Sequence, residues 1–207
     1  MAEDQDKEAR YHTRMARKKA VIDERIAAAQ EERGVLVINT GNGKGKSSAA
    51  FGVVARALGH DMKVAVIQFV KGRSDTGEEG FYRRVAQTTP GCLNWHVSGE
   101  GFTWETQDSS RDAAAARTAW ELACGYFADP GIGLVVLDEF TYALKYGWLD
   151  TAPVLAALAA RAPMQHVIIT GRGAPDALIE AADTVTEMAL VKHAFQAGVK
   201  GMPGLEW

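Results

Sequence analysis

The chain has 207 residues, of which 47% are hydrophobic and 24% are charged, as is typical of a globular domain with a substantial core. Its formal net charge of −3 gives no basic field that would attract nucleic acid. The two cysteines lie far apart, and the charged first residues and short apolar runs predict neither a secretory signal nor a membrane span. We therefore expect a cytoplasmic protein with reduced thiols that binds neither nucleic acid nor membrane.

The first 33 residues differ in composition from the rest, being densely charged and free of glycine and proline. Apolar side chains recur among them at roughly helical spacing: Met15, Ile22, Ile26 and Ala29. A solvated or partly disordered arm and an amphipathic helix that docks on the body or over a ligand both fit this pattern. We expect residues 1–33 to form a helical arm and residues 34–207 to form the main domain.

From Gly34 onward, apolar β-type runs alternate with helical stretches. The predicted strands are 35–39, 63–70, 93–97, 134–137, 166–170 and 185–191. The predicted helices are 47–58, 109–127, 151–161 and 175–182, and the stretch 72–80 predicts a mobile loop. This alternation indicates an α/β fold, with a mostly parallel sheet covered by helices on both faces. Ligands of such sheets bind at the carboxyl ends of the strands.

The run TGNGKGKSS at residues 40–48 follows the first predicted strand and opens the first predicted helix, the layout of a phosphate-binding loop. Glycines let successive backbone N–H groups point inward, and a solvent-facing Lys46 would supply a point charge. Ser47 is placed to offer its hydroxyl to Mg²⁺. We predict a nucleoside triphosphate site formed by Gly41, Asn42, Gly43, Lys44, Gly45, Lys46, Ser47 and Ser48.

One departure from the usual loop pattern stands at its start. The first glycine of that pattern would fall at Thr40, and glycines follow at positions 41 and 43 instead. A glycine-rich turn without a ligand is the alternative, which the preceding strand and the following helix disfavour. The shifted glycine indicates that the loop holds its polyphosphate in an unusual way.

A second apolar run, at residues 134–137, ends in Asp138 and Glu139. In phosphate-loop enzymes a carboxylate at this strand end lies beside the loop and helps to hold Mg²⁺ or its water. Many buried strands also end in an acidic turn residue, so the pair indicates a metal site only in combination with the phosphate loop. We predict that both residues are metal-side acids and leave open which one contacts the ion.

Two other segments carry candidate side chains. Phe102 and Trp104 stand in a glycine-flanked segment, where large rings either fill the core or meet an apolar ligand, and composition alone favours the core. Arg172 follows a predicted strand, where it either faces a phosphate or serves only to turn the chain.

These segments together resemble the ATP:corrinoid adenosyltransferases of cobalamin biosynthesis, the CobA/CobO/BtuR family. The likeness spans nearly the whole chain, and residues 1–33 are similar to the longer N-terminal helix of some members. One departure is Ser47-Ser48, where some members carry threonines. Besides the shifted loop, the matching segments are QFVKG (68–72), GFTWETQ (101–107), VLDEFTY (136–142), VIITGRG (167–173) and VKHAFQAGVK (191–200).

The resemblance implies a P-loop NTPase-like fold of RecA type and a reaction in which the Co(I) of a corrinoid attacks the 5′ carbon of ATP and releases triphosphate. ATP would lie in the loop in the reverse direction, and Lys46 and Ser47 would stabilise the triphosphate with Mg²⁺ or Mn²⁺. Phe102 and Trp104 would take the lower face of the corrin and displace the axial ligand of Co(II). A reduced flavoprotein could then generate Co(I).

The family commonly forms homodimers, and residues 1–33 could cover the bound corrin. Cob(I)yrinic acid a,c-diamide, cobinamide and cobalamin all remain open as substrates. A P-loop phosphotransferase or nucleotide hydrolase would use the same loop and acids, and a nucleotide-gated regulatory module is the non-enzymatic alternative. Phe102 and Trp104 favour the adenosyltransferase over these alternatives, because a hydrolase has no evident use for them.

Overall fold

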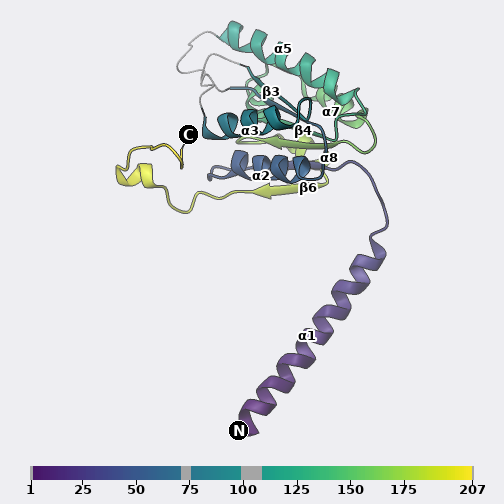
Figure 1. Ribbon diagram of the computed structural model, residues 1–207. Helices are drawn as coiled ribbons and strands as arrows, with labels where there is room; N and C mark the ends of the chain where they lie inside the picture. Colours follow the sequence, from purple (N-terminus) through teal and green to yellow (C-terminus); the bar gives the residue numbers. More distant parts are fainter. Residues whose placement is uncertain (1, 71–75, 99–108, 207) are drawn as a thin grey trace. The chain divides into compact units, whose positions relative to one another are not determined.

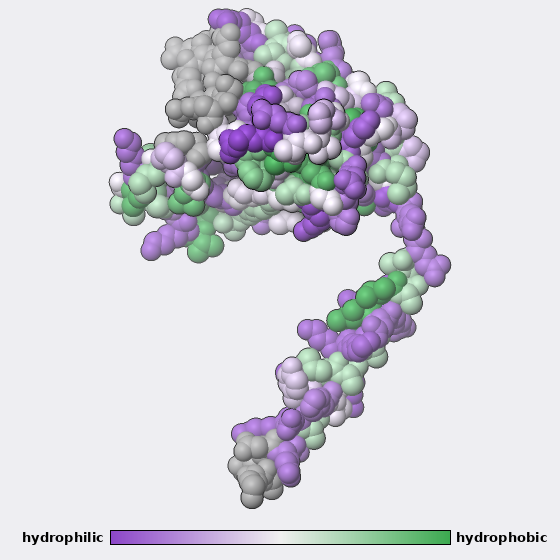
Figure 2. Space-filling model, in the orientation of Figure 1, coloured by the Kyte–Doolittle hydropathy of each residue, from purple (hydrophilic) through white to green (hydrophobic). Residues whose placement is uncertain are grey.

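The computed structural model describes residues 2–70, 76–98 and 109–206, and the chain divides into two units, residues 1–32 and 33–207. The first unit contains the helix α1 (Ala2–Ala28). Ion pairs one turn apart join its exposed side chains, such as Lys19 to Asp23 at 2.5 Å. Figure 2 shows a mostly hydrophilic helix with a hydrophobic band toward its C-terminal end, where Ile22 and Ile26 are exposed.

The second unit is built on a six-stranded sheet with the strand order β3-β2-β4-β5-β1-β6 (Figure 1), in which every pairing is parallel. This confirms the predicted α/β fold. Strand β5 lies between β1, which precedes the glycine-rich loop, and β4, which ends in the acid pair. The strands are β1 (Leu36–Thr40), β2 (Val64–Gln68), β3 (Leu93–Val97), β4 (Leu134–Asp138), β5 (His166–Thr170) and β6 (Thr184–Glu187).

Helices cover both faces of the sheet (Figure 1). On one face, α2 (Lys46–Leu58) and α3 (Gly77–Thr88) pack with the sheet in one buried cluster. On the other face lie α5 (Ser109–Phe127), α7 (Thr151–Ala159) and α8 (Asp176–Ala181). Two short elements complete the unit, α6 (Thr141–Lys145) after β4 and the 3₁₀ helix η1 (Ala194–Ala197) near the end of the chain. None of the helices within the described residues is both long and apolar enough to span a membrane.

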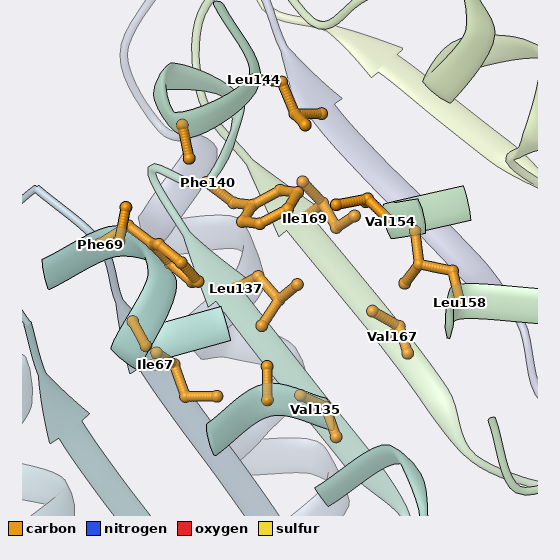
Figure 3. Packing of buried hydrophobic residues seen from close by; sticks show 14 of the residues in the cluster. Ile67, Phe69, Val135, Leu137, Phe140, Leu144, Val154, Leu158, Val167 and Ile169 are labelled. Carbon is orange, nitrogen blue, oxygen red and sulfur yellow. The ribbon is translucent and has the colours of Figure 1, made fainter. Parts of the chain in front are cut away.

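The larger core cluster fills the space between the sheet and the α5–α7 layer (Figure 3). The apolar runs of the central strands are buried on both faces, as in other parallel sheets, which explains their continuous valine, isoleucine and leucine content. Phe140, directly after the acid pair, is fully buried and packs edge-to-face on Phe69 with ring centroids 4.9 Å apart. The residue following the acid pair thus anchors that turn in the core.

Helix α3 corrects the prediction of a mobile loop over residues 72–80, because the part of that stretch from Gly77 onward is helical. Thr76 caps the helix by accepting a hydrogen bond from the backbone N–H of Glu79, and the buried Tyr82 stacks on Trp95 at 5.6 Å. The spacing of threonine and glutamate around Gly77 was a usable capping signal, which the glycines obscured.

Strand β6 is shorter than predicted and ends at Glu187 instead of residue 191. It lies at the edge of the sheet and pairs with β1, whose last residue, Thr40, is the register partner of Glu187. Because β1 gives way to the glycine-rich loop at that point, the backbone of β6 has no neighbouring strand along which to continue.

An ion pair fixes the start of this unit to β6. Arg33 Nη2 donates to Asp183 Oδ1 at 2.6 Å, and the backbone N–H of Leu36 donates to Asp183 Oδ2 at 2.7 Å. The hydrogen bond from Arg33 is the largest cause, and that from the N–H of Leu36 the next, of a pKa of Asp183 below its ordinary value.

Because the pKa is lowered in the folded state, the carboxylate stabilises the fold above the ordinary carboxyl pKa of about 4, and this contribution is lost as the pH falls through the lower folded value. Asp183→Asn is therefore expected to lower the melting temperature at neutral pH, with a difference from wild type that shrinks below about pH 4. Thermal unfolding followed from pH 7 to pH 3 measures this. A difference that stays constant over the whole range would contradict the assignment.

Candidate active site

The glycine-rich loop leaves the carboxyl end of β1 and packs closely against the chain that follows β6. Gly41 and Gly45 have φ angles of 95° and 105°, a region that residues with a Cβ rarely adopt. A Cβ on Gly41 would lie 2.5 Å from the carbonyl oxygen of Met188, and a Cβ on Gly43 would lie 2.5 Å from that of Ala189. Gly41 is thus required by both its conformation and the close approach of the C-terminal segment, Gly43 by the close approach and Gly45 by its conformation.

The C-terminal segment is therefore part of the site, which sequence reasoning did not identify. The backbone N–H of Gly43 donates to the carbonyl of Met188 at 2.6 Å, so this N–H does not point into the loop as predicted. The side chain of Lys44 forms an ion pair with Glu206. The loop and the C-terminal segment together line a cavity of about 380 Å³, and Lys192 and His193 are among its lining residues.

Lys46, the first residue of α2, is only 6% exposed, which corrects the prediction of a solvent-facing lysine. Its Nζ donates to the carbonyl oxygens of Gly41 at 2.8 Å and Gly43 at 2.5 Å, so the ammonium lies within its own loop. Burial lowers the pKa of Lys46, and the negative charge of Glu139 opposes this change. The structure thus brings together the two charged features that the sequence identified.

Asp138 and Glu139 have different environments at the end of β4. Asp138 is fully buried, and its two carboxylate oxygens accept from Gln68 Nε2 at 2.9 Å and from Thr170 Oγ1 at 2.7 Å. Glu139 is half-buried and has a φ of 57°, while its backbone N–H donates to Thr170 Oγ1 at 2.9 Å. A left-handed conformation in a residue with a long side chain is uncommon and marks a turn that its surroundings hold in place.

Three further residues stand around the acid pair. The hydroxyl of Thr141 donates to the carbonyl of Arg172 at 3.0 Å, which joins the turn after β4 to the turn after β5. The positive charge of the exposed Arg172 contributes to the lowered pKa of Lys46, and its two predicted roles, facing a phosphate or only turning the chain, both stay predictions. Tyr142 was not predicted; burial raises the pKa of its hydroxyl, and the charge of Glu139 raises it further.

The remaining predicted residues divide into two groups. Ser47 is half-buried in the first turn of α2, whereas Asn42 and Ser48 are exposed. Phe102 and Trp104, the predicted corrin-facing pair, lie outside the described residues, so their roles stay predictions.

The donor set fits a small divalent cation with hard oxygen ligands. No cluster of three or more histidine, cysteine, aspartate or glutamate side chains occurs where residues are described. Mg²⁺ typically binds through one or two carboxylates plus phosphate oxygens. The Ser47 hydroxyl and the acid pair are hard oxygen donors near a phosphate loop, the type of ligand that Mg²⁺ or Mn²⁺ takes.

A parallel α/β sheet with a glycine-rich loop after β1, a buried loop lysine and an acid pair at the end of β4 is typical of the phosphate-loop class of α/β proteins. Within that class, residues 32–207 match the family described as ATP:corrinoid adenosyltransferase BtuR/CobO/CobP. Residues 1–26 match the family described as cob(I)alamin adenosyltransferase N terminal.

Curated relatives agree with the family match. The chain is 60% identical to a corrinoid adenosyltransferase of Pseudomonas aeruginosa over 207 residues, the whole of both chains. It is 46% identical over 198 residues to the corrinoid adenosyltransferase CobA of Salmonella typhimurium, covering 96% of this chain and 98% of that protein. The Escherichia coli corrinoid adenosyltransferase is 45% identical with the same coverage. The chain therefore belongs to the ATP:corrinoid adenosyltransferase family, which confirms the resemblance and makes the protein a transferase.

Proposed function

We propose that this chain transfers the 5′-deoxyadenosyl group of ATP to the Co(I) of a corrinoid, in cobalamin biosynthesis or salvage. The cobalt electron pair forms the bond to C5′, the C5′–O bond breaks, and its electron pair leaves with the triphosphate. The observation that carries the proposal is the full-length identity of 60% to a protein named corrinoid adenosyltransferase. The site's features support it, because expelling triphosphate requires stabilisation of negative charge and no base to activate water.

In this proposal the loop stabilises the leaving group. Lys46 is desolvated and its Nζ is held within the loop by two loop carbonyls, so its positive charge would act on the leaving triphosphate with little screening by water. Arg172 supplies a second positive charge from the turn after β5. Mg²⁺ or Mn²⁺, when bound, would neutralise further phosphate charge, and Ser47 and Glu139 would hold it.

Phe102 and Trp104 would exclude the lower axial ligand of the corrinoid, so that a reduced flavoprotein can convert Co(II) to Co(I).

A homodimer is the proposed assembly, with the α1 arm over bound corrin. The apolar side chains of Val21, Ile22 and Ile26 in α1 support this use of the arm, since a corrin presents a large apolar edge.

The reaction is tested by its products. Incubation with ATP, Mg²⁺ and a chemically reduced corrinoid should yield a light-sensitive adenosylcorrinoid and one intact triphosphate for each transfer. A phosphotransferase or hydrolase would yield ADP or inorganic phosphate without an alkylated corrinoid, and a regulatory module would yield neither. Either of these outcomes would overturn the proposal.

The acid pair gives a prediction about the metal. Glu139→Gln is expected to raise the Mg²⁺ concentration for half-maximal rate by about tenfold, because a neutral amide is a poorer ligand for a hard cation. Its melting temperature should change little, since the side chain is half-buried. A titration of rate against Mg²⁺ at saturating ATP measures the effect.

Asp138→Asn provides the comparison. It replaces one carboxylate oxygen by an amide N–H₂ that must face Gln68 Nε2 or the Thr170 hydroxyl, both of which donate to Asp138. We expect a clear loss of melting temperature as well as a change in the metal titration. If neither substitution changes that titration, the end of β4 is structural and the assignment of the metal-side acids is wrong.

A further inference from the structure

A chain of buried hydrogen bonds crosses four adjacent strands and ends at the acid pair. Trp95 Nε1 on β3 donates to Gln68 Oε1 on β2 at 3.2 Å, and Gln68 Nε2 donates to Asp138 Oδ2 on β4 at 2.9 Å. Thr170 on β5 donates its hydroxyl to the other oxygen of Asp138 and accepts the backbone N–H of Glu139. Gln68, Asp138 and Thr170 are fully buried, and Trp95 is almost so.

The direction of this chain is fixed by chemistry. An indole N–H can only donate, so the amide oxygen of Gln68 must face Trp95. The amide nitrogen then necessarily faces Asp138, whose carboxylate accepts it. Trp95 therefore sets the orientation of Gln68, and Gln68 presents a donor, never an acceptor, to the carboxylate.

The same series of hydrogen bonds holds Glu139 in its strained turn. Its φ of 57° is disfavoured, and its N–H donates to the hydroxyl that also donates to Asp138. Loss of the Gln68 donor would remove a hydrogen bond from a buried carboxylate, which favours a shift of Asp138. Any movement of Asp138 is passed through Thr170 to the backbone of Glu139.

We infer that Gln68, oriented by Trp95, is a positioning residue that sets the geometry of the acid pair toward the divalent cation and the triphosphate. The inference rests on the proposed function for its metal and substrate. Gln68 is fully buried, so we assign it no contact with ATP or the cation. It acts through Asp138, and its effect on the reaction follows from the orientation of the Glu139 carboxylate.

A second buried glutamine supplies a matched control. Gln165 is 1% exposed and directly precedes β5, at the amino ends of the parallel strands, whereas the acid pair lies at their carboxyl ends. Its Nε2 donates to the carbonyl oxygens of Tyr126, Asp129 and Ile132 at 2.8, 3.3 and 3.0 Å. Replacing it removes a comparable set of buried hydrogen bonds without contact to the site.

The experiment compares Gln68→Met, Trp95→Phe and Gln165→Met in the full-length chain. Mn²⁺ binding in the presence of ATP, followed by electron paramagnetic resonance, reports metal affinity without turnover, and thermal unfolding is measured in parallel. We expect Gln68→Met to weaken Mn²⁺ binding about tenfold, the usual scale for losing a partner of a metal-side group, and Trp95→Phe to change it in the same direction. Gln165→Met should lower the melting temperature and leave the Mn²⁺ affinity unchanged.

Unchanged Mn²⁺ affinity in Gln68→Met would overturn the inference, as would equal weakening in Gln68→Met and Gln165→Met. Trp95→Phe, which keeps an aromatic ring in the core, decides the question if Gln68→Met does not fold: unchanged affinity in it counts against the inference. Formation of adenosylcorrinoid by the wild-type protein is assayed separately. Its absence would refute the proposed function, whereas the Mn²⁺ comparison tests the positioning role alone.

Discussion

Lys46→Ala is expected to lower the rate of adenosyl transfer about a hundredfold, which corresponds to about 3 kcal/mol of lost transition-state stabilisation. The ammonium is almost fully buried and is fixed by the carbonyls of Gly41 and Gly43, so its charge acts in a poorly solvated loop where it is weakly screened. The variant also leaves those carbonyls without this donor, so we expect a small loss of melting temperature. Single-turnover rates with chemically reduced corrinoid and saturating Mg-ATP measure the effect.

Lys44→Ala is the matched control. Lys44 lies in the same loop but is exposed and paired with Glu206, so its removal should cost much less rate. Comparable losses in the two variants would mean that general positive charge, and not the buried ammonium, supports the reaction. Near-normal turnover of Lys46→Ala would remove this residue from the mechanism.

Trp104→Ala should impair the reduction of Co(II) to Co(I) and largely spare the transfer of the adenosyl group. If the Phe102 and Trp104 rings exclude the lower axial ligand of Co(II), their contribution is to the formation of Co(I). We therefore expect a large loss of turnover when Co(II) corrinoid is reduced by a flavoprotein, and a much smaller loss when a strong chemical reductant supplies Co(I). ATP affinity should stay nearly unchanged, because an interaction absent from the nucleotide site cannot alter it.

The two assays together test the prediction, and Trp104→Phe refines it. Phenylalanine keeps an apolar ring and should restore part of the flavoprotein-dependent rate. Equal losses in both assays would mean that Trp104 only holds the corrin or packs the core. A variant that no longer folds would favour the core role that composition alone suggests.

Several features of the site are readable from short stretches of sequence. The loop at residues 40–48 combines a strand, glycines and Gly-Lys-Ser within a few residues, and the acid pair follows a short apolar run. The alternation of strands and helices predicted the parallel sheet because each element carries its own pattern of side chains. The capping signal of α3 was equally local, and its glycines obscured it.

Other features depend on residues far apart in the chain. Gln68 stood out in the sequence only as part of the matching segment QFVKG, because Asp138 is 70 positions away and becomes its neighbour through the pairing of β2 with β4. The contact between the loop and the tail likewise joins Lys44 to Glu206, 162 positions apart. No local pattern encodes such contacts, because they arise only when the strand order is set.

The sequence by itself determined the class of this protein, because a phosphate loop is a local arrangement of backbone and charge that few other patterns resemble. Only the tertiary structure decided the environment of each of these residues. It buried Lys46, turned the Gly43 N–H toward Met188, and gave Asp138 two donors while Glu139 took a strained turn. The physical reason is that burial, hydrogen-bond partners and backbone strain are properties of the space around a residue, which strands distant in the sequence supply when they pair.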